Sequence, residues 1–191
     1  MRILCLATIA TAIFFYPLPS QSNDIPVPKS VDISISGIFL DDSETVKAII
    51  GEDIDLIEPS DFFPHLKVVN KSNTELLILI AHPGSVLNTF NEVIVRKKGE
   101  QENGQSIKMP SISHFVTGNN IRLGISSGEL VNILGKAQRT DKIDTKNKVV
   151  YEIGDFDKSE FLKYYNMPYY YGEYVFIDDK LVKFKFGFSY P

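Results

Sequence analysis

The chain has 191 residues, a formal net charge of −4 and 43% hydrophobic residues. This length suits one ordinary domain or two small ones, and the composition is that of a globular protein. The mild acidity argues against nucleic-acid binding, which needs a basic face. A single cysteine, Cys5, leaves no pair for a disulfide and no thiolate cluster for a metal.

The first 22 residues have the pattern of a secretion signal. Arg2 is the only charged residue before Asp24, and the stretch from Ile3 to Tyr16 is almost wholly apolar. That stretch is shorter than the ~20 residues that cross a bilayer as a helix, and prolines follow it. We predict cleavage after Ser22 and a periplasmic or secreted mature chain without stable membrane insertion. A buried N-terminal helix or a membrane anchor is the alternative.

A strand and a short helix are predicted next. Residues 31–36 alternate apolar and polar side chains, the period of a half-buried strand. Asp41 and Glu44 have the spacing of a capping box. Val46, Ile49 and Ile50 then form one apolar face, and Gly51 ends the helix.

Three strands are predicted after this helix, over residues 65–70, 75–82 and 86–97. Short polar segments with turn residues separate them, at the length of hairpin connections. Residues 76–81 are all apolar, which favours a central strand covered on both faces. Residues 98–112 are mostly polar and are interpreted as a linker.

The same order of elements is predicted again after the linker. Ser126 and Glu129 form a second capping box, and Gly135 ends a second short helix. Strands are predicted over 149–153, 173–177 and 181–188, the last two joined by a hairpin turn at 178–180.

We therefore predict an α+β fold of two tandem repeats, residues 23–97 and residues 113–191. Each repeat would be a short helix followed by an antiparallel sheet of three to four strands. Setting Gly51 on Gly135 aligns the apolar positions of the two helices without a gap.

The second half resembles a known superfamily. The stretch from Leu123 to Ala137 (LGISSGELVNILGKA) is similar to the opening motif of the superfamily that groups the β-lactamase inhibitory protein with small lipoproteins of outer-membrane assembly. Val150-Tyr151-Glu152 and the segment 176–181 (FIDDKL) resemble its Tyr-centred strand and its hairpin. The resemblance covers 121–188 well and 38–97 weakly, and Ala137 replaces the usual proline. It implies a protein-binding fold and transfers no catalytic residue.

No motif in the sequence indicates catalysis, a metal site or a cofactor. His65, His82 and His114 are isolated from one another, and no Gly-x-Ser-x-Gly elbow or phosphate loop is present. The acidic pairs at 41–42 and 178–179 are interpreted as a helix cap and a hairpin turn. We predict a chain that is not an enzyme and needs no cofactor.

Tyrosines mark the most unusual stretch. Six of the nine tyrosines lie between residues 164 and 174: Tyr164, Tyr165, Tyr169, Tyr170, Tyr171 and Tyr174. Tyrosine is enriched at binding hot spots, and we predict a loop that binds another protein. The alternatives are that half of these rings pack over the sheet, or that they form a platform for a sugar. The acidic residues Glu52, Asp53 and Asp55 are predicted to complement a basic partner.

These observations favour a binding module over an enzyme. The first hypothesis is an exported inhibitor or immunity-type protein that neutralises a secreted or periplasmic enzyme or toxin. The second is a structural scaffold of envelope assembly. The third and weakest is a hydrolase, which would need a pocket holding one of the three histidines beside a carboxylate.

Overall fold

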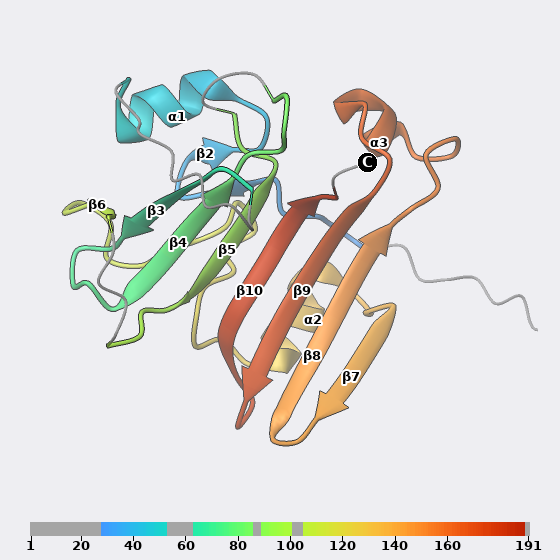
Figure 1. The fold of residues 1–191 in the computed structure, drawn as a ribbon. Helices are drawn as coiled ribbons and strands as arrows, with labels where there is room; N and C mark the ends of the chain where they lie inside the picture. The colour runs from blue at the N-terminus through green and yellow to red at the C-terminus, as the bar shows by residue number, and fades with distance from the viewer. Residues whose placement is uncertain (1–27, 53–62, 86–88, 101–104, 190–191) are drawn as a thin grey trace, which may run out of the picture.

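The large sheet of this protein contains strands from both halves of the chain. The computed structural model describes residues 28–52, 63–85, 89–100 and 105–189, so the predicted secretion signal lies outside the described residues. The described residues form an eight-stranded sheet, a two-stranded hairpin and three short helices (Figure 1). The strand order in the sheet is β6-β3-β4-β5-β10-β9-β8-β7.

All neighbouring strands in this sheet are antiparallel except β3 and β6, which are parallel. The strands of the sheet are β3 (His65–Val69), β4 (Glu75–Ile80), β5 (Glu92–Lys97), β6 (Ile107–Lys108), β7 (Arg139–Ile143), β8 (Lys146–Ile153), β9 (Tyr170–Ile177) and β10 (Lys180–Phe188). The small hairpin consists of β1 (Ser34–Ile35) and β2 (Ile38–Phe39).

The predicted pair of tandem repeats is wrong. β10, the last strand of the chain, pairs with β5 from the first half over five residue pairs, from Lys183 opposite Arg96 to Gly187 opposite Glu92. The molecule is therefore mostly β, with one mixed sheet in place of two helix-and-sheet units. Local sequence patterns predicted most of these strands, but they carry no information about which strand edges join across such a distance in the chain.

The three helices are α1 (Ser43–Ile50), α2 (Ser127–Leu134) and α3 (Glu160–Tyr165). The predicted capping box of Ser126 and Glu129 is confirmed at the start of α2. The one predicted at the start of α1 is wrong, because Asp42 has the extended backbone of an N-cap and accepts bonds from the amides of Glu44 and Thr45.

Four elements were not predicted: β2, β6, β7 and α3. α3 and the start of β9 divide the tyrosine-rich stretch, which is therefore not one loop. β7 carries three charged residues and Ile143 as its only apolar residue, so it lacks the alternation of a half-buried strand. α3 packs against Phe188, which is distant in sequence, whereas β7 pairs with β8, the next strand along the chain.

One hydrophobic cluster lies between the sheet and the helices, and it contains residues from β3, β4, β5, β8, β9 and β10. The segment before β1 is held against it: the Lys29 amide donates to the Leu134 carbonyl (2.8 Å), and Tyr170 Oη donates to the Asp32 carbonyl (2.8 Å). Among the described residues, no helix is both long and apolar enough to cross a membrane.

Candidate functional site

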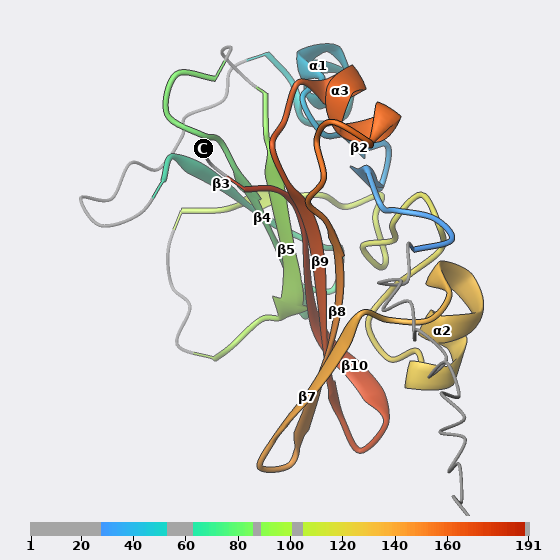
Figure 2. The ribbon, with the colours of Figure 1, turned by 90° about the vertical axis from the view of Figure 1, so that its right-hand side faces the viewer.

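Among the described residues, the helices cover one face of the eight-stranded sheet and none lies on the other (Figure 2). In the view along the sheet, α1, α2, α3 and the β1–β2 hairpin all lie on the same side (Figure 2). Tyr151 of β8 confirms which side chains point there, because its hydroxyl donates to the Gly135 carbonyl at the end of α2 (2.9 Å). We call the opposite side the helix-free face.

The strand register fixes which residues share the helix-free face. On the half formed by β5, β10, β9, β8 and β7, the row through Lys185 also contains Ile94, Glu173, Val150 and Arg139. The next row contains Arg96, Lys183, Val175, Lys148 and Asp141. Together the two rows place lysines on β10, a glutamate on β9, a lysine on β8, and one charge of each sign on β7.

These side chains pair with one another. Lys148 Nζ lies 3.4 Å from Glu173 Oε1 and 3.9 Å from Asp141 Oδ2, while Arg139 Nε lies 3.1 Å from Asp141 Oδ2. A second Arg139 nitrogen lies 3.8 Å from Glu152 Oε1. All five side chains are partly accessible to solvent, so each pair contributes little stability.

Glu92 of β5 is the best-buried carboxylate on this face. It is 6% exposed, and its oxygens contact His82 Nε2 (3.2 Å) and Lys185 Nζ (2.9 Å). The Tyr171 hydroxyl also donates to Glu92. The Lys185 ammonium lies 4.6 Å from the centre of the Tyr171 ring, which adds a cation–π contact.

Gly187 makes the contact between Tyr171 and Glu92 possible. In the register, Gly187 of β10 lies directly between Tyr171 of β9 and Glu92 of β5. Because Gly187 has no side chain, the Tyr171 ring can extend across β10 and reach the carboxylate two strands away. The cluster of His82, Glu92, Tyr171 and Lys185 therefore joins β5 and β9 across the strand that lies between them.

The pKa values in this cluster follow from its contacts. Burial raises the pKa of Glu92, but the bonds from His82 and Tyr171 and the charge of Lys185 outweigh burial and lower it below the ordinary value. Burial, together with the Glu92 charge, raises the pKa of the Tyr171 hydroxyl well above its usual range. Glu92 is thus held as a carboxylate and Tyr171 as a neutral donor, an arrangement that suits a structural link.

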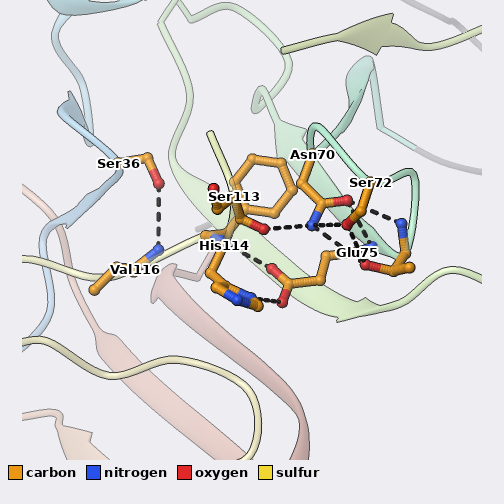
Figure 3. Close-up of polar contacts among 9 residues, drawn as sticks. Ser36, Asn70, Ser72, Glu75, Ser113, His114 and Val116 are labelled. Carbon is orange, nitrogen blue, oxygen red and sulfur yellow. Dashed lines mark hydrogen bonds and ion pairs between the residues drawn. The ribbon is translucent and has the colours of Figure 1, made fainter. Parts of the chain in front are cut away.

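A second buried carboxylate, Glu75 of β4, lies on the opposite side of the same strand pair. Its Oε1 lies 2.6 Å from His114 Nδ1, and its Oε2 accepts from the Phe115 amide (2.9 Å) (Figure 3). The His114 ring is mostly solvent-exposed. Glu75 therefore fastens the segment after β6 to the sheet.

Asn70 completes this fastening at the turn between β3 and β4. Its Nδ2 donates to the Ser113 carbonyl (2.7 Å), and its Oδ1 accepts from the amides of Thr74 (2.9 Å) and Glu75 (3.0 Å). The Val116 amide, further along the same segment, donates to Ser36 Oγ (3.2 Å) (Figure 3). These bonds are made within the protein and fix its loops, so we assign this network a structural role.

The six predicted tyrosines are distributed over different environments. Tyr170 and Tyr174 are each 1% exposed and face the core, where Tyr174 Oη donates to Asp32 Oδ2 (2.9 Å). Tyr171 points to the helix-free face as described above, and Tyr164 of α3 is 83% exposed. Only part of the set is therefore accessible to a partner.

Tyr165 and Tyr169 are half-buried. The Tyr165 ring packs against Phe188 with the ring centres 4.9 Å apart. Burial and the neighbouring Glu152 carboxylate raise the pKa of Tyr169 to about 12. Of the predicted acidic residues, Glu52 is exposed at the end of α1, whereas Asp53 and Asp55 lie outside the described residues.

Tyr169 also lines an open groove of about 1470 Å³ at the end of β8. Lys29 of the N-terminal segment, Glu152 and Phe156 line it as well. Its lining includes charges of both signs, and Lys158 pairs with Asp155 there at 2.8 Å. The residues that line the groove do not indicate one class of ligand.

Within the ranges that the structure describes, no group of three or more His, Cys, Asp or Glu side chains could hold a metal ion. Sequence reasoning missed the charged rows of the helix-free face. One local signal was present, because Lys183 and Lys185 alternate with apolar residues in β10. The residues of β5, β9, β8 and β7 that share their rows could not be identified without the strand order.

Comparison with known proteins identifies no relative: no protein-family model, no curated protein and no solved structure matches the chain. The resemblance to the superfamily of the β-lactamase inhibitory protein stays a prediction.

Proposed function

We propose that this chain is an exported, non-enzymatic protein-binding module that binds its partner through the β7–β10 half of the helix-free face. The observation that carries the proposal is the set of partly accessible, paired charges of both signs on β7, β8 and β9, namely Arg139, Asp141, Lys148 and Glu173. The other face of the same strands packs against α2 and the N-terminal segment.

A surface of this kind suits a folded protein partner. Its side chains project from strands whose backbones are paired on both sides or along one side, so little backbone entropy is lost when a partner binds. A fixed pattern of charges of both signs selects a partner with the complementary pattern and disfavours others through like-charge contacts. Lys185 adds a cation in the row of Glu173, and Tyr171 adds an aromatic ring in the neighbouring row. The class of partner we propose is a secreted or periplasmic enzyme or toxin.

Site-specific crosslinking tests this proposal. Cys5 is the only cysteine and lies in the predicted signal, so the exported form carries one thiol wherever one is introduced. A photoreactive group is attached to E173C on the helix-free face and, as the matched control, to V131C on the exposed side of α2. We expect E173C to crosslink to one defined protein from the extracellular or envelope fraction, and V131C not to do so.

The charge-reversal variant K148E/E173K provides the second arm, with the photoreactive group moved to V175C on the same face because position 173 is changed. It keeps an ion pair between positions 148 and 173 but reverses the pattern presented to a partner. The exchange also places a carboxylate opposite Asp141 and an ammonium opposite Lys185, so circular dichroism checks that the variant is folded. We expect V175C alone to crosslink to the same protein as E173C, and V175C in the charge-reversal variant to lose it.

Equal crosslinking from E173C and V131C, or none from E173C, contradicts the proposal. A soluble enzyme or toxin as the captured protein favours the inhibitor or immunity role, and envelope-assembly proteins favour the scaffold alternative.

A hydrolase is the weaker alternative, and the buried pair of His82 and Glu92 is the contact that favours it. Both Glu92 oxygens are already engaged by partners within the chain, which argues for the structural role described above. Hydrolysis of a peptide or ester substrate that is lost in His82→Ala would favour the enzyme instead.

A further inference from the structure

β7 forms an open edge of the sheet. No described segment lies beyond it in either view (Figures 1 and 2), and no backbone hydrogen bond outside the β7–β8 ladder involves its residues. The opposite edge is formed by β6, which has only two residues. An exposed edge strand can pair with a strand from another chain, so β7 is the candidate for such pairing among the described strands.

The hairpin geometry shows which backbone groups are available. Residues along an antiparallel strand alternate between directing their amide and carbonyl toward the neighbouring strand and away from it. The turn between β7 and β8 consists of Asp144 and Thr145, with Ile143 opposite Lys146. Counting back from this turn, Thr140 and Lys142 direct their amide and carbonyl groups away from β8.

From this edge we infer that the partner of β7 is β7 of a second copy of the chain, related by a two-fold axis through Thr140. In that register Thr140 lies opposite Thr140 of the second copy, and Arg139 of each copy lies opposite Asp141 of the other. Gln138 lies opposite Lys142. Two reciprocal ion pairs and a threonine pair are favourable cross-strand contacts, and no like charges meet.

Other centres within β7 are less favourable. An axis through Asp141, Arg139 or Lys142 places that residue opposite its own copy, so two equal charges meet. An axis through Ile143 requires the turn residue Asp144 to pair, but Asp144 has a left-handed backbone (φ 52°). The Thr140 register also places residues of the helix-free face opposite residues of the same face, so the two sheets become one continuous sheet.

The association is expected to be weak. A short edge strand contributes less area than the roughly 1,200–2,000 Å² that stable complexes bury. Exposed ion pairs add modest energy that salt reduces. The dimer should therefore form at high protein concentration and low salt, and it does not depend on the proposed partner protein.

Sedimentation equilibrium of the purified chain up to about 1 mM tests the inference, since that range populates even weak complexes. We expect the mass to rise with concentration from that of one chain toward twice that value. R139D and D141R should each weaken self-association by at least about tenfold, because each places like charges opposite one another. Thr140→Pro should abolish it by removing an outward amide while keeping the β7–β8 ladder.

Mixing provides the decisive control. Each of the variants R139D and D141R is unfavourable for pairing with its own copies. When the two variants are mixed, opposite charges meet at both cross-strand positions, so we expect one chain of each variant to form a mixed dimer. A general folding defect could not produce this rescue, and circular dichroism of each variant checks the fold directly. A wild-type chain that stays monomeric throughout the range, self-association unaffected by Thr140→Pro, or the absence of a mixed dimer overturns the inference.

Discussion

The pairing of β5 with β10 depends on a glycine at position 187. A Cβ atom at this position would lie 2.7 Å from the Glu92 Cα atom and closer still to the Asn91 carbonyl oxygen, and the backbone φ is +147°. Both neighbours are backbone atoms of the adjacent strand, so the clash cannot be relieved by rotating a side chain. Gly187 also leaves the space through which Tyr171 reaches Glu92.

We predict that Gly187→Ala lowers the free energy of unfolding by about 2–4 kcal/mol, because it combines steric overlap with an unfavourable φ. Gly128→Ala is the matched control: Gly128 lies in α2 with only a 4.0 Å contact and a negative φ. Alanine there should be neutral or stabilise by about 0.5 kcal/mol. Urea unfolding of both variants measures the difference, and equal effects would contradict this account of Gly187.

The buried Asp32 makes the stability of the protein depend on pH. It is fully buried, and burial raises its pKa above the ordinary value of 3.8 even though bonds from Thr117, Tyr174 and Asn119 act in the opposite direction. The folded chain therefore binds this proton more tightly than the unfolded chain does. The stability that protonation contributes is fully present below pH 3.8 and is lost as the pH rises through the folded-state pKa.

We predict that Asp32→Asn removes this dependence. As the pH rises above 3.8, the wild-type free energy of unfolding should fall relative to that of Asp32→Asn until Asp32 is ionised in the folded chain. Urea unfolding across a pH series measures the difference, with the exposed substitution Asp157→Asn as control. A gap between wild type and Asp32→Asn that is constant over this range, or that changes in the opposite direction, would show that the environment of Asp32 is not as described.

At the scale of elements, the sequence was informative where structure is local. The Ser126–Glu129 cap and the turn at 178–179 were predicted because each is fixed by residues within one turn of each other. α3 was missed because its six residues gain their stability from packing, with Phe161 and Tyr165 against Phe188. β7 was missed because an edge strand need not alternate apolar and polar residues.

In the candidate site, too, local features were predicted and features that depend on the strand arrangement were not. Tyrosine enrichment led to residues 164–174 being predicted as one binding loop, but alternation along β9 directs Tyr170 and Tyr174 into the core and Tyr171 to the opposite face. The strand limits decide these directions, and the predicted strand began three residues too late. Predicting the charged rows requires the strand order as well as the strand limits, because Lys148, Glu173 and Lys185 become neighbours only when three strands are placed in order.

At the scale of the whole molecule, the pairing of β5 with β10 makes the two halves parts of one structure. β10 contributes Phe184 and Phe186 to the shared core, opposite Val95 and Val93 of β5. The N-terminal segment crosses to the second half, where Lys29 bonds to the end of α2. Separating the halves would expose this apolar surface and leave both strand edges unpaired.

We therefore predict that both halves unfold in a single transition. Thiol-reactive fluorophores on K71C, in the turn between β3 and β4, and on T145C, in the turn between β7 and β8, report on the two halves separately. Their urea transitions should have the same midpoint and slope, because loss of either half removes the strand that covers the edge of the other. Gly187→Ala, which acts at the junction, should shift both transitions together. If the T145C probe changes at a different urea concentration from the K71C probe, the two halves are independent folding units and the continuous sheet does not govern stability.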